Sequence, residues 1–363
     1  MSVREYQRQM PLGGGLGTKL SARLHLDAPL LTALLLLVLG GLAVLYSAGG
    51  GDLNLVVRQS IRLGAGFLVL LVLAQIPPRS YRFWTPVIYA IGATRWLTLP
   101  GIGRFQPAEL MKLAVPAMVA WFFSERNLPP NKLDVLAALG LIFLPVVMIA
   151  VQPDLGTSIL IAAAGLVVLF MAGLSWRLIS LAVLVLVIAA PLMYFFVLHD
   201  YQRSRVDTFL NPEADPRGAG WNIIQSKTAI GSGGVTGKGW LDGTQSRLDF
   251  LPESSTDFIL AVLGEEFGLI GFVLLISIYL VIVGRGFFIS WQAQETFSRL
   301  LAAALTMTFF IYIFVNVGMV SGLLPVVGVP LPLVSYGGTS IVTLMASFGM
   351  LMSIHTHRRL MTY

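Results

Sequence analysis

The sequence predicts an all-α protein that crosses a membrane many times. Of its 363 residues, 56% are hydrophobic and only 12% are charged, and the mean hydropathy is +0.80. An ordinary soluble domain has roughly 25% charged residues, so this chain has too little charge to cover a water-facing surface. These values exclude a soluble enzyme and a disordered chain. The basic residues are scattered, which argues against a nucleic-acid-binding protein despite the net charge of +6.

Long apolar runs define the expected elements, which together form a single integral membrane domain over residues 1–363. A membrane-spanning helix needs roughly 20 apolar residues. The runs are rich in Leu, Val and Ile and lack alternating polarity, which argues against a transmembrane β-barrel. Nine runs are predicted to span the membrane: Ala28–Ser47, Ile61–Ile76, Leu110–Phe123, Leu136–Val151, Ser158–Leu174, Leu178–Leu198, Phe258–Val283, Leu300–Val320 and Ile341–Ile354.

The distribution of Lys and Arg predicts a tenth span, because short cytoplasmic loops carry an excess of these residues. With nine spans, the 18 cations outside the long polar segment divide evenly between the two sides. One further span between Tyr81 and Arg95 puts 13 in the cytoplasm and five outside. The candidate, Phe83–Ala93, has 11 residues and is too short to cross. We therefore expect a ten-span bundle with both termini cytoplasmic and part of one helix missing; a true nine-span protein is the alternative.

The longest polar segment, residues 199–256, is expected to form an extracytoplasmic loop that leads into Asp257 and a long apolar helix. A carboxylate at the mouth of a cavity can act as a general base. Alternatively, Ser254 and Asp257 form a capping box. Glu265 lies eight residues further on, about 12 Å along the helix. Charge at that depth faces a partner or a water-filled cavity, and a structural ion pair involving Glu265 and Glu266 is equally open.

Three further stretches hold polar candidates. Arg104, Glu109 and Lys112 precede or begin an apolar helix, and Glu109 and Lys112 share a face as either a surface salt bridge or a polar pair inside the bundle. Asp154 suits a turn between two spans. Lys238 follows a glycine-rich stretch that is either a phosphate cradle or, more simply, a flexible turn.

No metal site is predicted. The chain has no Cys, which excludes thiol catalysis, disulfides and Cys-ligated metals. His355 and His357 form only a weak metal pattern. Next to Arg358 and Arg359 they favour a cationic tail that faces lipid headgroups.

Ungapped motifs cover nearly the whole chain from about residue 24 onward. They are AQIPP (74–78), RFQP (104–107), QPDLGTS (152–158), HDYQR (199–203), QSK (225–227), IGSGG (230–234), TDF (256–258), PVVGVPLPLVSYGG (325–338) and IHTHR (354–358). Together these motifs resemble the SEDS family (shape, elongation, division and sporulation), in its rod-shape branch. The family has a full third transmembrane helix where this chain has only residues 83–94, which agrees with the missing part of a helix.

The resemblance implies a peptidoglycan glycosyltransferase of the bacterial inner membrane that polymerises lipid II on the outer face during cell elongation. It also implies partners: a class B penicillin-binding protein that crosslinks the strands, and other membrane proteins of the elongation complex. The essential Asp of the family falls on Asp257, and its polar Glu and Lys fall on Glu109 and Lys112. Relatives often have a His close to this Asp, where this chain has Ser254 and Ser255.

The implied reaction needs one base and one source of positive charge. The donor is α-linked and the product β-linked, so a single inverting displacement suffices. The leaving undecaprenyl pyrophosphate would be balanced by Lys112, Arg104, Arg203 or Lys238, or by a divalent cation, the one cofactor that this chemistry suggests. Two other functions stay open: a lipid II flippase whose passage is lined by the same residues, and a non-catalytic scaffold for the penicillin-binding protein.

Overall fold

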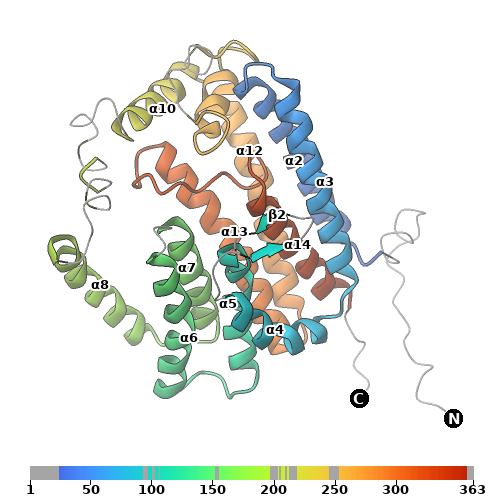
Figure 1. The fold of residues 1–363 in the computed structure, drawn as a ribbon, viewed down its shortest axis with the longest axis vertical. Coiled ribbons are helices and arrows are strands. Elements are labelled where there is room, and N and C mark those ends of the chain that lie inside the picture. Colours follow the sequence, from blue (N-terminus) through green and yellow to red (C-terminus); the bar gives the residue numbers. More distant parts are fainter. Residues whose placement is uncertain are drawn as a thin grey trace.

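Most of the helices pack side by side in one bundle, whereas the helix Trp176–Phe196 stands apart from them (Figure 1). The computed structural model describes residues 24–92, 97–99, 103–105, 107–151, 155–196, 203, 206–208, 211, 219–244 and 253–357. The longer described helices are α2 (Ala28–Ala48), α3 (Leu53–Gln75), α4 (Pro78–Gly92), α5 (Pro107–Ser124), α6 (Lys132–Ala150), α7 (Leu155–Met171), α8 (Trp176–Phe196), α10 (Ala219–Gly233), α12 (Ile259–Gln292), α13 (Thr296–Val320) and α14 (Thr339–Thr356).

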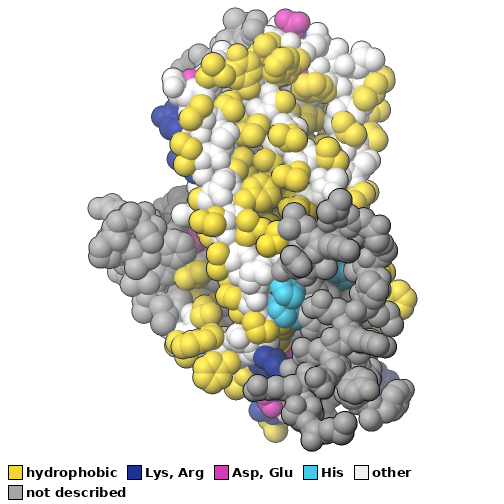
Figure 2. Space-filling model, turned by 90° about the vertical axis from the view of Figure 1, so that its right-hand side faces the viewer, with side chains coloured by type: hydrophobic (Ala, Val, Ile, Leu, Met, Phe, Trp, Pro, Cys, Tyr) yellow, Lys and Arg dark blue, Asp and Glu magenta, His cyan; other side chains and the backbone are white. Residues whose placement is uncertain are grey.

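The chain is a multi-pass membrane protein, as its composition predicts. Six helices, α2, α3, α6, α12, α13 and α14, are long and apolar enough to cross a bilayer. The remaining helices of the bundle are shorter or more polar; α7, for example, has 17 residues. Hydrophobic side chains are spread over the described part of the face in Figure 2, and the few charged groups lie mostly along its outline. This distribution suits a surface that faces lipid.

Several helices begin earlier than their apolar runs suggest, because their first turns are polar and capped. Asp52 accepts a hydrogen bond from the Asn54 N–H, so α3 begins at Leu53 and not at Ile61. Asn131 and Asp134 form a capping box that starts α6 at Lys132. Caps of this kind satisfy backbone N–H groups at the start of a helix that have no partner within it. The apolar runs therefore located the helices but did not include their polar first turns.

The two ends of the described chain meet at one end of the bundle. The rings of His25 and His357 stack with centroids 4.1 Å apart. Close by, His355 and Arg285 both contact the Asp27 carboxylate, at 3.1 Å and 2.7 Å. Two termini on one side of the membrane would lie close together in this way, and the even number of spans stays a prediction from the Lys and Arg distribution.

Residues 83–92 of the candidate tenth span belong to α4, which has 15 residues, and Ala93 lies outside the described residues. At 1.5 Å per residue this helix is roughly 22 Å long, short of the 30 Å core of a bilayer. A two-stranded antiparallel hairpin, β1 (Leu97–Leu99) and β2 (Gly103–Phe105), joins α4 to α5. The all-α prediction included no strands, because strands of only three residues are too short to show a recognisable alternating pattern.

Aromatic side chains pack α12, α13 and α14 against one another. Tyr279 of α12 lies against Phe309 of α13, and Phe309 lies against Phe348 of α14, with centroids 5.7 Å and 5.1 Å apart. The buried Tyr279 hydroxyl donates to the Pro332 carbonyl at 2.8 Å. Residues 321–338, which join α13 to α14 and are called the return loop below, are thereby tied to the core.

Candidate active site

The turn 253–258 carries Asp257 into the start of α12. The Thr256 and Phe258 N–H groups donate to the Glu253 carbonyl at 3.0 Å and 3.3 Å. The cap residue of α12 is Phe258, with no side-chain capping hydrogen bond, and the Ser254 hydroxyl donates instead to the Ala48 carbonyl at 3.3 Å. The capping-box alternative for Asp257 is therefore wrong.

Asn316 of α13 fixes the main chain at Asp257. Its amide nitrogen donates to the Asp257 carbonyl at 2.9 Å and to the Val329 carbonyl of the return loop at 2.8 Å. Asn316 is fully buried. A buried amide that bridges two carbonyls holds α13, the return loop and the Asp257 turn in one arrangement.

The Asp257 carboxylate itself has no hydrogen bond or ion pair with any residue that the structure describes. A Cβ atom at Gly328 of the return loop would lie 3.6 Å from its Oδ2 atom, so this glycine leaves room in front of the carboxylate. Burial, and secondarily the Glu253 carboxylate, raise the pKa of Asp257 to about 6. A group of this kind is suited to accept a proton near neutral pH.

Two polar residues of α3 hold the return loop from the other side. The Gln59 amide donates to the Ser335 carbonyl at 3.0 Å, and its oxygen accepts from the Gly337 N–H at 3.3 Å. Arg62 lies 4.5 Å over the Tyr336 ring and donates to the Gly337 carbonyl at 3.4 Å. No carboxylate in the described part of the chain pairs with Arg62.

Sequence reasoning missed Asn316, Gln59 and Arg62 as site residues. The available signal was the presence of polar side chains inside otherwise apolar helices, which usually marks an internal contact or a functional site. Gln59 and Arg62 are three residues apart and share one face of α3. Their partners, however, are backbone atoms of a distant loop, which no local pattern indicates.

Glu109 and Lys112 form a pair inside the bundle, not at its surface. Their side chains are 8% and 7% exposed, and the Lys112 Nζ atom lies 2.6 Å from Glu109 Oε1. The Thr343 hydroxyl donates to the other Glu109 oxygen at 3.1 Å, and the Lys112 ammonium lies 5.3 Å from the centroid of the Tyr312 ring. Tyr312 precedes Asn316 by four residues, so this pair contacts α13 about one turn from the Asn316 bridge.

Glu265 and Lys238 form a second ion pair. Glu265 is fully buried and accepts hydrogen bonds from the Lys238 ammonium at 2.7 Å and from the Thr244 N–H and hydroxyl at 2.9 Å. Glu266 points elsewhere and accepts from the Ser47 hydroxyl. The ion-pair alternative for Glu265 is therefore realised, with Lys238 as the partner.

The glycine-rich segment 231–239 packs against a break in α12 and supplies backbone hydrogen bonds there. At Gly268 the helix has φ 60° and ψ −154°, a conformation open only to glycine. The segment repairs the interrupted hydrogen-bond ladder. The Lys238 and Gly239 N–H groups donate to the Glu265 and Glu266 carbonyls, both at 3.0 Å. The Leu269 and Ile270 N–H groups donate to the Gly234 and Val235 carbonyls at 3.0 Å and 3.1 Å. These contacts favour neither a flexible turn nor a phosphate cradle.

Two residues that the sequence proposed for the site have no described side chain. For Arg104 the structure describes the backbone only, on β2 opposite Thr98. Asp154 lies outside the described residues. His355 and His357 lie at the end of the bundle with Asp27, and the described part of the chain holds no group of three or more His, Cys, Asp or Glu side chains suited to a metal ion.

The chain matches known proteins along almost its full length. The profile of the FtsW, RodA and SpoVE family, described as a cell cycle protein, matches residues 26–360. The chain is 52% identical over 356 residues to peptidoglycan glycosyltransferase MrdB of Escherichia coli (strain K12), covering 94% of this chain and 96% of that protein. It is 31% identical over 363 residues to stage V sporulation protein E of Bacillus subtilis (strain 168), covering 92% and 98%.

Solved structures have the same fold. A chain of a peptidoglycan synthase complex, from work on the structural coordination of polymerization and crosslinking, matches with a TM-score of 0.79 and 27% identity, over 91% of this chain and 97% of that one. The crystal structure of the rod shape determining protein RodA of Thermus thermophilus matches with a TM-score of 0.67 and 25% identity, over 91% and 96%. The chain therefore belongs to the FtsW/RodA/SpoVE family, the SEDS family of membrane proteins.

Proposed function

We propose that this chain is a peptidoglycan glycosyltransferase that polymerises lipid II on the outer face of the bacterial inner membrane during cell elongation. The 52% identity with MrdB of Escherichia coli supports the activity. Asp257 carries the mechanism, because it is the half-buried carboxylate that no described residue engages, at the start of the longest helix. The positive-inside distribution puts this end of α12 outside the cytoplasm, where the lipid-linked sugars would lie.

In the proposed reaction, Asp257 takes the proton from the 4-hydroxyl of the acceptor sugar. That oxygen forms a bond to the anomeric carbon of the donor as the bond to the pyrophosphate breaks. Undecaprenyl pyrophosphate leaves, and the anomeric carbon inverts in one displacement. A pKa of about 6 keeps most Asp257 ionised at pH 7 while making it a stronger base than an ordinary aspartate.

The departing pyrophosphate needs positive charge. Lys112 and Lys238 are already paired with Glu109 and Glu265. We assign the contact to Arg62 instead, because it borders the return loop that faces Asp257 and no described carboxylate pairs with it. A divalent cation at the pyrophosphate stays a prediction, and it would supply further positive charge to the leaving group.

We also infer a transpeptidase partner. The similar chain with a TM-score of 0.79 belongs to a peptidoglycan synthase complex that coordinates polymerization with crosslinking. By analogy, a class B penicillin-binding protein would crosslink the strands that this chain makes, within an assembly of other elongation membrane proteins.

The experiment is glycan-strand synthesis from purified lipid II by the full chain in detergent. Asp257→Asn, which removes the base but keeps the shape, should lower the rate by about 10²-fold or more. An Asp257→Asn protein with the native rate would refute the assignment of the base. Strands made in detergent, where no second compartment exists, would exclude a pure flippase. Strands made without a partner would exclude a scaffold.

A matched pair of variants on α3 tests the cation. Arg62→Gln should lower kcat, whereas Arg58→Gln, one turn away, should not. Arg58 is exposed and makes only a loose contact of 4.0 Å with Asp52. Equal losses in the two variants would mean that general surface charge, and not Arg62, assists the leaving group.

A further inference from the structure

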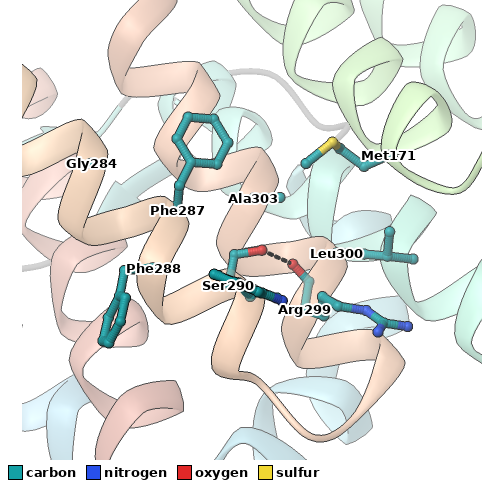
Figure 3. A pocket seen from close by; sticks show the side chains of 9 residues that line it. Met171, Gly284, Phe287, Phe288, Ser290, Arg299, Leu300 and Ala303 are labelled. Carbon is teal, nitrogen blue, oxygen red and sulfur yellow. Dashed lines mark hydrogen bonds between the residues drawn. The ribbon is translucent and has the colours of Figure 1, made fainter.

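A hollow of about 520 Å³ lies between the last turns of α12, the first turns of α13 and the end of α7 (Figure 3). Its floor is buried and consists of Leu300, Ala303 and Ser290. Figure 3 shows Phe287 and Met171 on opposite sides of Ala303, with the Arg299 side chain extending below Leu300. The hollow is therefore mainly apolar and has one cationic group.

The hollow lies toward the end of α12 away from Asp257. Gly284, on its lining, lies 27 residues after Asp257, roughly 40 Å along α12. Trp291 is 84% exposed and Phe288 38%, and exposed Trp is typical of the membrane–water interface. A Cβ atom at Gly284 would meet no atom within 4 Å, so this glycine leaves open space beside the helix.

Arg299 differs from most arginines near this end of the bundle. Four of them are paired with carboxylates: Arg79 with Glu295, Arg82 with Glu125, Arg126 with Asp134 and Arg285 with Asp27. Arg299 is exposed, and no carboxylate in the described ranges pairs with it. Its carbonyl accepts a hydrogen bond from the Ser290 hydroxyl at 2.9 Å, which fixes the main chain and leaves the guanidinium available.

We propose that this hollow binds an anionic phospholipid, with an acyl chain against Phe287 and Gly284 and the phosphate on Arg299. The apolar floor suits a chain and not a free phosphate, whereas a single uncommitted guanidinium suits one phosphate. The positive-inside distribution assigns this end to the cytoplasmic leaflet, where anionic lipids attract basic residues. The site is separate from Asp257 and does not depend on the proposed glycosyltransferase activity.

Native mass spectrometry of the full chain in detergent tests the proposal, with phosphatidylglycerol and phosphatidylcholine of identical acyl chains as probes. In the parent chain we expect tighter binding of phosphatidylglycerol. Arg299→Gln should reduce this preference about five-fold, the weight of one basic residue next to anionic lipid. Arg177→Gln is the matched control, since Arg177 is also exposed, has no carboxylate partner among the described residues and does not line the hollow.

Gly284→Leu tests the acyl-chain half of the site. Because a Cβ atom here meets nothing within 4 Å, the added side chain should occupy part of the hollow and weaken the binding of both lipids. A preference for phosphatidylglycerol that survives Arg299→Gln, or falls equally in Arg177→Gln, would overturn the phosphate contact. Unchanged lipid binding in Gly284→Leu would overturn the chain contact. Unfolding temperatures measured without added lipid confirm that each variant is folded.

Discussion

Replacing Glu253 by Gln should make the enzyme more active in acid. The exposed Glu253 carboxylate lies on the same turn as Asp257 and raises its pKa. Its main-chain carbonyl accepts from the Thr256 and Phe258 N–H groups, and the substitution leaves those bonds in place. Glu253→Gln therefore changes the electric field at Asp257 while keeping the turn.

The size of the effect follows from the pKa of Asp257, which rises from an ordinary 3.8 to about 6. The base must be ionised, so the rate falls as the pH drops through this pKa. At pH 5 about one tenth of Asp257 is ionised. Burial is the larger cause of the rise and Glu253 the smaller, so Glu253→Gln lowers the pKa by less than about one pH unit. The rate at pH 5 should then rise by at most about five-fold, with no change at pH 8.

The assay is the pH profile of kcat/KM for lipid II polymerisation, which reports groups in the free enzyme. Glu253→Asp keeps the charge and should keep the acid limb near pH 6. Added salt should shift the limb downward in the parent chain but not in Glu253→Gln, because an exposed charge is screened. An acid limb at the same pH in both Glu253 variants would refute the electrostatic argument, and no acid limb near pH 6 would refute Asp257 as the base.

The remaining predictions concern the supports of the site. Asn316→Ala leaves two buried carbonyls without a donor and should destabilise the protein by about 2 kcal/mol, measured as a lower unfolding temperature, and lower kcat as well. Lys238→Met leaves the Glu265 charge buried and should destabilise more than the double variant with Glu265→Leu, in a double-mutant cycle of unfolding temperatures. Gly268→Ala introduces a Cβ 2.4 Å from the Gly237 nitrogen and should lower expression and unfolding temperature sharply. Gly64→Ala, where a Cβ meets nothing within 4 Å, should be neutral or slightly stabilising.

The sequence carried enough information for the fold and for one candidate residue of the site. Apolar runs located the membrane helices because burial in lipid imposes a simple length rule. Asp257 became a candidate because a carboxylate at the start of an apolar helix needs an explanation. The starts of α3 and α6 were missed because their first turns, which Asp52 and Asn131 cap, are polar.

The rest of the site depends on contacts between segments far apart in the chain. Asn316 and Arg62 donate hydrogen bonds to backbone carbonyls of the return loop. A local sequence pattern does not predict contacts between segments so far apart in the chain. The glycines of residues 231–239 suggested a turn or a phosphate site. Close approach explains them: a Cβ at Gly233 would lie 2.0 Å from the Gly264 carbonyl oxygen. From the sequence, Lys238 was a candidate to balance the charge of the substrate. Its ion pair with Glu265 depends on the packing of this segment on α12, which the sequence pattern does not predict.

The break in α12 makes one membrane helix depend on residues about 30 positions earlier in the chain. Its ladder at Gly268 is complete only while residues 234–239 stay docked, because they supply four of its backbone partners. A force on residues 234–239 would therefore reach α12 at Gly268, within one turn of Glu265 and three turns from Asp257. A protein that displaces these residues would shift the start of α12, and with it the proposed base Asp257, without touching that side chain.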